Sequence, residues 1–144
     1  MNKALRFVWL SLLTLFCGVA SARTVVFDPA TDVSSGTSLT KDGVTITMTS
    51  GTSSFAATDY NGTLSYAFGK GTGFEFTAGE SVKINSVTFD YQSAGGYIYD
   101  RNYTTSSTEF EGGKTYTVSG EGASKLKFSV FSGPMYFSKI TVEW

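Results

Sequence analysis

The segment Val44-Thr45-Ile46-Thr47-Met48 alternates apolar and polar side chains without a break, and Leu64-Ser65-Tyr66-Ala67-Phe68 follows a similar pattern. Successive side chains of a β-strand point to opposite faces, so each segment predicts a strand with one buried face. After position 22, no window of about eleven residues carries the spacing of an amphipathic helix. The sequence therefore predicts an all-β domain.

Similar runs extend this prediction along the chain. Strands are expected at 24–27, 74–77, 82–84, 87–91, 97–100, 115–119, 126–131 and 136–144. Short strands with Gly-rich breaks are typical of an antiparallel β-sandwich. Long polar stretches lie at 28–43, 49–62 and 101–113. On a rigid sandwich such loops usually carry the function.

One strand has an irregular pattern. Its apolar positions switch from even numbers at Val82 and Ile84 to odd numbers at Val87 and beyond. A straight strand would turn half of these side chains to water. The switch predicts a bulge or bend at Asn85-Ser86.

The run Gly69-Lys70-Gly71-Thr72-Gly73 is rich in glycine, as phosphate-binding loops are. It lies between two expected strands, however, and leads into no helix. A phosphate loop uses the amide dipole of a helix N-terminus, which is missing here. We expect a hairpin turn instead.

The first 22 residues have the parts of a secretory signal peptide. Lys3 and Arg6 form a positive head, residues 7–19 are almost wholly apolar, and Ala20-Ser21-Ala22 supplies small residues for signal peptidase. As a helix the apolar stretch would reach only about 20 Å, which is short for a membrane anchor. We expect cleavage after Ala22 and an exported chain, secreted or periplasmic, in which 23–144 forms one β-sandwich domain outside the membrane.

Composition narrows the chemistry of this domain. The chain has no histidine, and its single cysteine, Cys17, lies in the expected signal peptide. Histidine acid–base chemistry, cysteine nucleophiles and zinc sites are therefore excluded. The 11 Lys and Arg nearly balance the 12 Asp and Glu, and no basic stripe with interleaved aromatic residues is present. Nucleic acid is not an expected partner.

The densest group of binding-type side chains is Tyr97-Ile98-Tyr99-Asp100-Arg101-Asn102-Tyr103. A sugar presents an apolar C–H face and a rim of hydroxyls, so its binder needs aromatic rings and fixed donors and acceptors. If the two tyrosines flanking Ile98 point outward, Ile98 packs in the core and the polar residues 100–102 lie at the mouth of the next loop. In the opposite arrangement, the tyrosines fill the core and Ile98 lies outside. The sequence leaves both arrangements open.

A second, weaker group is Asp59-Tyr60-Asn61, again a carboxylate, a ring and an amide. It offers the same kinds of contact to a sugar. The alternative is a simple turn at Asn61-Gly62, because Asn-Gly is a strong turn signal.

Asp28 and Asp32 stand on either side of Pro29 and could supply oxygen ligands to a calcium ion together with loop carbonyls. An aspartate before a proline is equally an ordinary turn at the end of a strand. No other cofactor is expected.

KDGVTITM at 41–48, SYAFGKGTGFEFTAGESVKINSVTFDY at 65–91 and FSKITVEW at 137–144, together with the signal peptide, resemble small secreted bacterial β-sandwich modules. These are modules of the galactose-binding-like, carbohydrate-binding-module type. The resemblance spans the mature chain and implies a jelly-roll-like sandwich of about eight or nine strands, with glycan contacts from loop aromatics or from one sheet face. An obvious tryptophan platform is missing, and Trp144, which completes the last alternation, is expected to close the core.

These observations predict an exported, non-catalytic binding module for carbohydrate or cell-surface glycan. A structural or adhesive surface protein that acts by protein–protein contacts is the first alternative. A small polysaccharide lyase, with a tyrosine as base and Arg101 beside the substrate, is the second. The sequence leaves the oligomeric state open.

The tyrosine group at 97–103 has a direct test. Replacing Tyr99 and Tyr103 by alanine should abolish binding on a glycan array and leave the melting temperature nearly unchanged, because rings on an outer face add little to the core. An equal loss of thermal stability would place these rings in the core and contradict the hypothesis.

Overall fold

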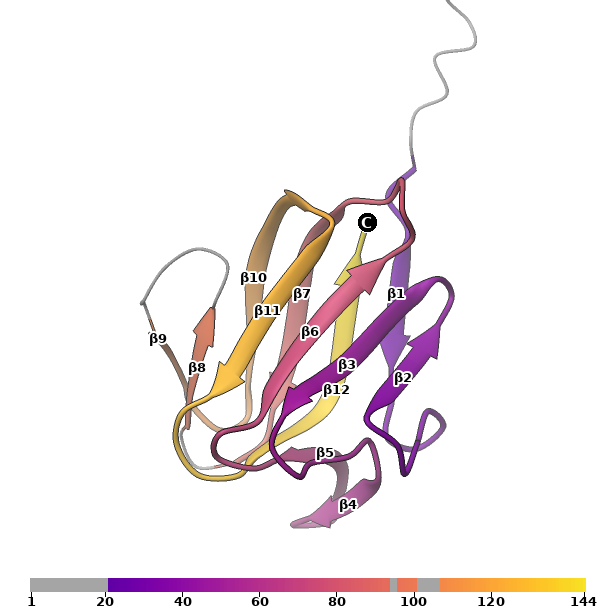
Figure 1. The fold of residues 1–144 in the computed structure, drawn as a ribbon. Helices are drawn as coiled ribbons and strands as arrows, with labels where there is room; N and C mark the ends of the chain where they lie inside the picture. Colours follow the sequence, from indigo (N-terminus) through magenta and orange to yellow (C-terminus); the bar gives the residue numbers. More distant parts are fainter. Residues whose placement is uncertain (1–20, 94–95, 101–106) are drawn as a thin grey trace, which may run out of the picture.

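The computed structural model describes residues 21–93, 96–100 and 107–144. Within them the strands form two antiparallel sheets packed face to face, and there is no helix (Figure 1). The prediction of an all-β sandwich is confirmed. In this part of the chain, no helix is long and apolar enough to cross a membrane.

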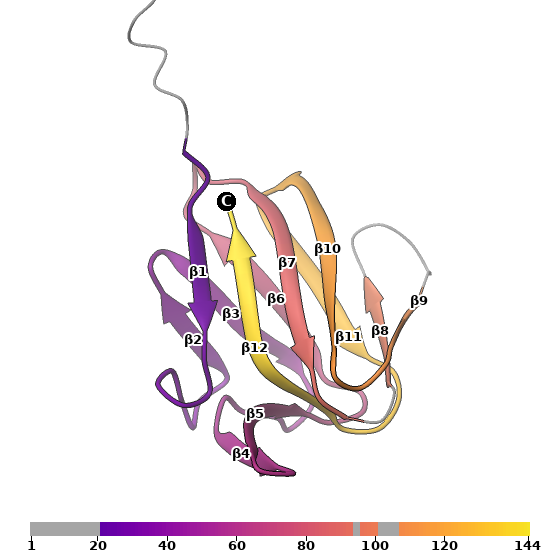
Figure 2. The same ribbon diagram turned by 180° about the vertical axis from the view of Figure 1, so that it is seen from behind.

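Sheet I holds both ends of the described chain. Its strands are β1 (Thr24–Phe27), β4 (Ala57–Tyr60), β5 (Thr63–Phe68), β7 (Ile84–Tyr91), β10 (Lys114–Ala123) and β12 (Met135–Glu143). Their order is β10–β7–β12–β5–β4, and β1 also pairs with β12. Figure 2 shows β1, β12, β7 and β10 in front, with the β4–β5 hairpin below them.

Sheet II covers the other side of the core. Its strands are β2 (Ser38–Lys41), β3 (Val44–Ser50), β6 (Gly73–Ala78), β8 (Gly96–Asp100), β9 (Ser107–Phe110) and β11 (Lys125–Val130). They are arranged in the order β2–β3–β6–β11–β8–β9.

The described residues form twelve strands, more than the eight or nine expected. The additional strands β2, β4 and β9 have four residues each and come from the three stretches predicted as loops. Each lies at a sheet edge, where backbone hydrogen bonds to one neighbour hold it. A strand fixed in this way needs no long apolar alternation, so the sequence pattern did not reveal it.

The core between the sheets is rich in phenylalanine. Nine phenylalanines are at most 1% exposed: Phe27, Phe55, Phe68, Phe74, Phe76, Phe89, Phe110, Phe128 and Phe137. Rings from the two sheets meet, with the centroid of Phe89 5.5 Å from that of Phe128 and 6.2 Å from that of Phe74. The two segments that predicted the fold both contribute, because Val44, Ile46 and Met48 of β3 and Tyr66 and Phe68 of β5 are buried.

The bulge predicted at Asn85-Ser86 is confirmed. Both residues lie outside the core between buried Ile84 and Val87. The partner strand β10 shifts its register opposite them, between Ser119 and Ala123.

The prediction of a hairpin turn at Gly69–Gly73 is wrong. β5 belongs to sheet I and β6 to sheet II, so the run is a corner between the sheets. The hydroxyl groups of Ser53 and Thr72 hydrogen-bond at 2.7 Å, and Gly69 N donates to Ser53 Oγ at 2.9 Å. Sequence periodicity describes each strand but not the sheet that it joins, so the corner was not distinguishable from a hairpin.

The bulge requires glycine at position 120. A Cβ added there would lie 2.2 Å from the backbone oxygen of Ile84, whereas at Gly79 the nearest atom, Val82 Cγ2, would be 3.8 Å away. Gly120→Ala should therefore lower the free energy of unfolding by about 2 kcal/mol or more. Gly79→Ala, the matched control, should change it by less than about 0.5 kcal/mol in urea denaturation. Equal effects of the two substitutions would contradict this account of the bulge.

Candidate functional site

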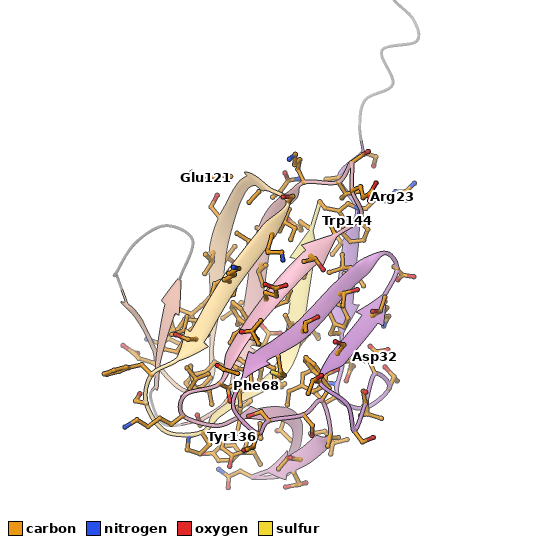
Figure 3. The ribbon with its side chains drawn as sticks, viewed as in Figure 1. Arg23, Asp32, Phe68, Glu121, Tyr136 and Trp144 are labelled. Atoms are coloured by element: carbon orange, nitrogen blue, oxygen red, sulfur yellow. The ribbon has the colours of Figure 1, made fainter. Side chains whose placement is uncertain are left out.

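Two tyrosines from different strands stack on the outer face of sheet I. The ring centroids of Tyr60 in β4 and Tyr136 in β12 are 4.2 Å apart, with an angle of 21° between the ring planes. Both side chains are half-buried, so part of each remains open to solvent. Tyr136 lies at the end of β12 away from the C-terminus (Figure 3).

Strand alternation places Tyr136 on this face. Its neighbour Phe137 is fully buried in the core, so Tyr136 points the other way. Next to it, in β7, Tyr91 is buried and the following Gln92 is half-buried. Gln92 N donates to the backbone oxygen of Tyr136 at 2.9 Å, which holds the two residues side by side.

A tight hairpin brings Tyr60 to the same face. Asn61 and Gly62 have φ angles of 52° and 82°, which fit a two-residue turn and pair Tyr60 with Thr63. Tyr136 pairs with Ala67 on the other side of β5. Ser65 lies midway between Thr63 and Ala67 on the outer face and is 0% exposed. Tyr60 and Tyr136 therefore lie on either side of Ser65 on this face.

Polar groups lie directly beside the stacked pair. Gln92 Nε2 donates to Ser138 Oγ at 2.8 Å, which fixes the side-chain amide next to Tyr136. A register shift between Phe137 and Lys139 forms a second bulge, and it leaves both Ser138 and Lys139 outside the core. The Gln92 amide has a further N–H and a carbonyl oxygen that can serve a ligand.

The outer face of sheet I continues as a polar surface away from the tyrosines. Thr115 Oγ1 donates to Asp90 Oδ1 at 2.7 Å, and the hydroxyl groups of Thr88 and Thr117 lie 2.8 Å apart. These cross-strand pairs satisfy one another. We therefore take the tyrosine pair with Gln92 and Ser138 as the candidate site, and name it the tyrosine face.

The chemistry of the tyrosine face suits binding. It offers aromatic ring surface, phenol hydroxyls, an amide and a serine hydroxyl. The buried tyrosines nearby keep their hydroxyl protons: burial raises the pKa of Tyr91, an effect larger than the opposing hydrogen bond from Ser93. Burial likewise raises the pKa of Tyr66, and the nearby carboxylates of Asp32 and Asp28 raise it further.

The group Asp59-Tyr60-Asn61 is divided by the hairpin. The turn predicted at Asn61-Gly62 is confirmed. Tyr60 joins the tyrosine face, whereas Asp59 alternates to the opposite face and pairs with Leu64. Asp59 Oδ1 accepts a hydrogen bond from Gly62 N at 3.0 Å, a local contact that supports the turn.

Residues 101–103 of the group at 97–103 lie outside the described residues. β8 pairs with β11 and β9. Ile98 lies in the core and is 1% exposed, as expected if the neighbouring tyrosines point outward. Nothing is described of the side chains of Tyr97, Tyr99 and Asp100, or of Arg101, Asn102 and Tyr103 at all. Glycan contact through this group stays a prediction.

Asp28 and Asp32 belong to a set of contacts between the sheets that also includes Lys41 and Tyr66, and we name this set the clasp. Lys41 Nζ on β2 donates to Asp32 Oδ2 at 2.7 Å and to the backbone oxygen of Val26 on β1 at 2.9 Å. Tyr66 on β5 donates its hydroxyl hydrogen to the backbone oxygen of Asp32. The clasp thus ties the loop after β1 to strands of both sheets.

The carboxylates of the clasp have protein partners. Asp32 Oδ2 also accepts from Asp28 N at 3.0 Å, and Asp28 Oδ1 accepts from Ala30 N at 2.8 Å. Among the described residues, no group of three or more Asp, Glu, His or Cys gathers as metal ligands would. Calcium at this turn stays a prediction, and the ion would have to displace the ammonium group of Lys41.

The sequence analysis missed Tyr136 and Gln92. Phe137 has an odd number whereas Ile140 and Val142 have even numbers, the same change of parity that revealed the first bulge. This signal indicates a bulge at Ser138-Lys139 and places Tyr136 outside. No sequence pattern indicated the contact between Tyr136 and Tyr60, because their strands β12 and β4 are separated by β5 in the sheet.

Trp144 packs against the core as expected, and it also lines an open pocket described below.

Comparison with known proteins gave structural neighbours only. No family model and no curated protein matches the chain. A family 29 carbohydrate-binding module from Piromyces equi is 12% identical, covers 86% of this chain and 91% of its own, and has a TM-score of 0.47. The Clostridium perfringens module CpGH89CBM32-6 is 14% identical over 71% of this chain and 94% of its own, with a TM-score of 0.42.

A third neighbour is the family 32 carbohydrate-binding module of C. perfringens NanJ, solved in complex with galactose. It is 13% identical over 85% of this chain and 93% of its own, with a TM-score of 0.37. These neighbours fall in the class that the sequence resembles. At such identities and scores the likeness carries no argument about function, and the fold assignment rests on the strand pairings of this chain.

The clasp should make stability depend on acid pH. Burial alone would raise the pKa of Asp32, but the hydrogen bonds from Lys41 and from Asp28 N, with the charge of Lys41, hold it below its usual value. The carboxylate therefore stabilises the fold fully above about pH 5, and this contribution is lost as the pH falls through the lowered pKa. Asp32→Asn should cost about 1 kcal/mol of unfolding free energy at pH 7 and clearly less at about pH 2.

Urea denaturation at the two pH values measures this difference. Asp42→Asn is the matched control, because Asp42 is exposed at the β2–β3 turn and asparagine also tolerates its φ of 48°. Its effect should stay below about 0.5 kcal/mol at both pH values. A pH-independent loss in Asp32→Asn would show that the carboxylate charge does not stabilise the clasp.

Proposed function

We propose that this chain is an exported, non-catalytic module that binds carbohydrate through the tyrosine face. The observation that carries the proposal is the stacked pair of Tyr60 and Tyr136 beside the fixed amide of Gln92. The C–H face of a pyranose packs on aromatic rings, and its hydroxyls pair with amide and hydroxyl groups at the ring edge.

The geometry favours an extended glycan. The polar surface of Asp90, Thr88 and their cross-strand partners runs along β7 from the tyrosine face, so further sugar units can lie over it. Binding at an open sheet face does not enclose the ligand. Such a site leaves water in contact with the glycan, which suits recognition better than bond cleavage.

The group at 97–103 extends the proposal to a second contact surface. β8 belongs to sheet II, whereas Tyr60 and Tyr136 belong to sheet I. We therefore treat the two tyrosine groups as separate candidates. Export after cleavage at Ala22, which the signal-peptide pattern predicts, is part of the same proposal.

One observation favours the alternative of a surface protein that acts by protein–protein contacts. β10 has ten residues and lies at the edge of sheet I, where a strand of another chain could pair with it. Under this alternative the processed chain assembles in size-exclusion chromatography through β10. Under the carbohydrate proposal it elutes as a monomer and binds glycan in that state.

Removing the rings tests the proposal. Tyr60→Ala and Tyr136→Ala should each weaken binding to the glycans selected on an array by about tenfold or more, because each removes one ring of the stacked pair. Tyr136→Phe keeps the ring and should retain most of the affinity. Isothermal titration calorimetry measures the affinity, and thermal melting monitors the fold.

Tyr116→Ala is the matched control. Tyr116 is also a half-buried tyrosine stacked on one ring, with its centroid 4.1 Å from that of Phe110, but it lies in β10 at the opposite edge of sheet I. Its replacement should lower thermal stability to a similar degree and leave binding intact. If Tyr116→Ala weakened binding while Tyr60→Ala and Tyr136→Ala did not, the tyrosine face would not be the site.

A further inference from the structure

An open pocket lies at the end of the sandwich far from the tyrosine face. It has a volume of about 600 Å³, and its lining includes Arg23, Ser81, Lys83, Asn85 and Trp144. In Figure 3, Arg23 and Trp144 lie close together at the end opposite Tyr136. The strand from Tyr136 to Trp144 rises about 26 Å, so one sugar unit cannot touch both places.

Backbone hydrogen bonds join the residue before β1 to the residue after β12 beside this pocket. Arg23 N donates to the backbone oxygen of Trp144 at 2.7 Å, and Trp144 N donates to that of Arg23 at 3.0 Å. Trp144 packs against the core on one side and remains half-buried. The indole is therefore held in place at the mouth of the sandwich with part of its surface available.

The side chains that line the pocket carry positive charge and no carboxylate. Arg23 and Lys83 line it and both are exposed, and the one negative group in the lining of chain 23–144 is the α-carboxylate of Trp144. Within the described residues, the ion pairs involve Lys41, Lys114 and Lys125, and neither Arg23 nor Lys83 has an acidic partner. Two unpaired cations beside one cavity attract an anion and can hydrogen-bond a carboxylate.

The first bulge gives the pocket an amide. Because Asn85 is turned out of the core between Ile84 and Val87, its side chain becomes part of the lining. An amide and the hydroxyl of Ser81 can pair with sugar hydroxyls, and an indole supplies the apolar surface for a sugar ring. The set of groups thus combines carboxylate recognition with sugar recognition.

We propose that this pocket is a second site, specific for a carboxylate-bearing saccharide of the uronate type. Lys83 and Arg23 hold the carboxylate, and the sugar ring packs on Trp144. The proposal goes beyond the tyrosine face and does not depend on it, because the two sites share no residue.

Export processing would change the lining of this site. Ser21 and Ala22 also line the pocket, and cleavage after Ala22 would remove both. Arg23 would then carry an α-ammonium group at the position of its present backbone N–H. One of its hydrogens would keep the bond to Trp144 O and pair the new charge with the α-carboxylate of Trp144 in chain 23–144, which leaves the side chains of Arg23 and Lys83 to hold the ligand.

The test uses the processed chain, residues 23–144, which contains every strand that the structure describes. Of the two tryptophans, Trp9 lies in the expected signal peptide, so Trp144 is the single tryptophan of this chain and reports on the pocket. Titration with short oligogalacturonates should change its fluorescence. Methyl-esterified oligomers, which lack the carboxylate charge, should bind about tenfold more weakly or worse.

Lys83→Met keeps the apolar stem and removes the charge, and should weaken oligogalacturonate binding by about tenfold. Lys127→Met is the matched control: Lys127 is exposed on β11, away from the pocket lining, and its replacement should leave binding unchanged. Raising the salt concentration should weaken binding to the unmodified chain. Circular dichroism verifies that each variant is folded.

Three results would overturn the proposal. One is equal binding of charged and esterified oligomers. Another is an equal effect of Lys83→Met and Lys127→Met. The third is loss of binding in Tyr136→Ala but not in Lys83→Met, which would move the uronate to the tyrosine face and leave the proposed function standing. The proposed function, by contrast, would fail if Tyr60→Ala and Tyr136→Ala left the binding of neutral glycans unchanged.

Discussion

The layer of phenylalanine rings between the two sheets is the constraint on which the rest of the structure depends. Phe74 of sheet II stacks on Phe128 at 5.4 Å, and both contact Phe89 of sheet I. Packing of this kind fixes which face of every strand is inside, since a one-residue slip would expose a whole row of rings. The composition of the outer faces follows from this choice.

The tyrosine face is a consequence of that choice. Burial of Phe137 and Tyr91 leaves Tyr136 and Gln92 no place except the outer face, side by side. The β4–β5 hairpin then adds Tyr60 from across β5. Function on this module is therefore proposed for rigid strands, where the core holds the site in shape before a ligand arrives. The two bulges also shape the outer face, because each turns two consecutive polar side chains away from the core.

Alternation in the sequence was sufficient for the fold class and for one bulge. The segment at 44–48 buries its predicted face, and the change of parity after Ile84 marks the bulge correctly. In 64–68, Tyr66 and Phe68 are buried as predicted, whereas Leu64 is exposed beside the edge strand β4. An edge strand such as β4 could not be predicted, because its four residues Ala-Thr-Asp-Tyr show no alternation of apolar and polar side chains. The stacking of Tyr60 on Tyr136 depends on sheet order, which local pattern does not encode. The pocket at Trp144 likewise forms only when β1 and β12 pair.

The central claim is that a sugar ring packs on the tyrosine face. The most direct measurement is the NMR spectrum of residues 23–144 with a glycan selected on an array. The account predicts nuclear Overhauser effects between C–H protons of the sugar and ring protons of Tyr60 or Tyr136, with upfield shifts of those sugar protons. Saturated binding with both tyrosine ring signals unchanged, and sugar contacts only to other residues, would contradict it.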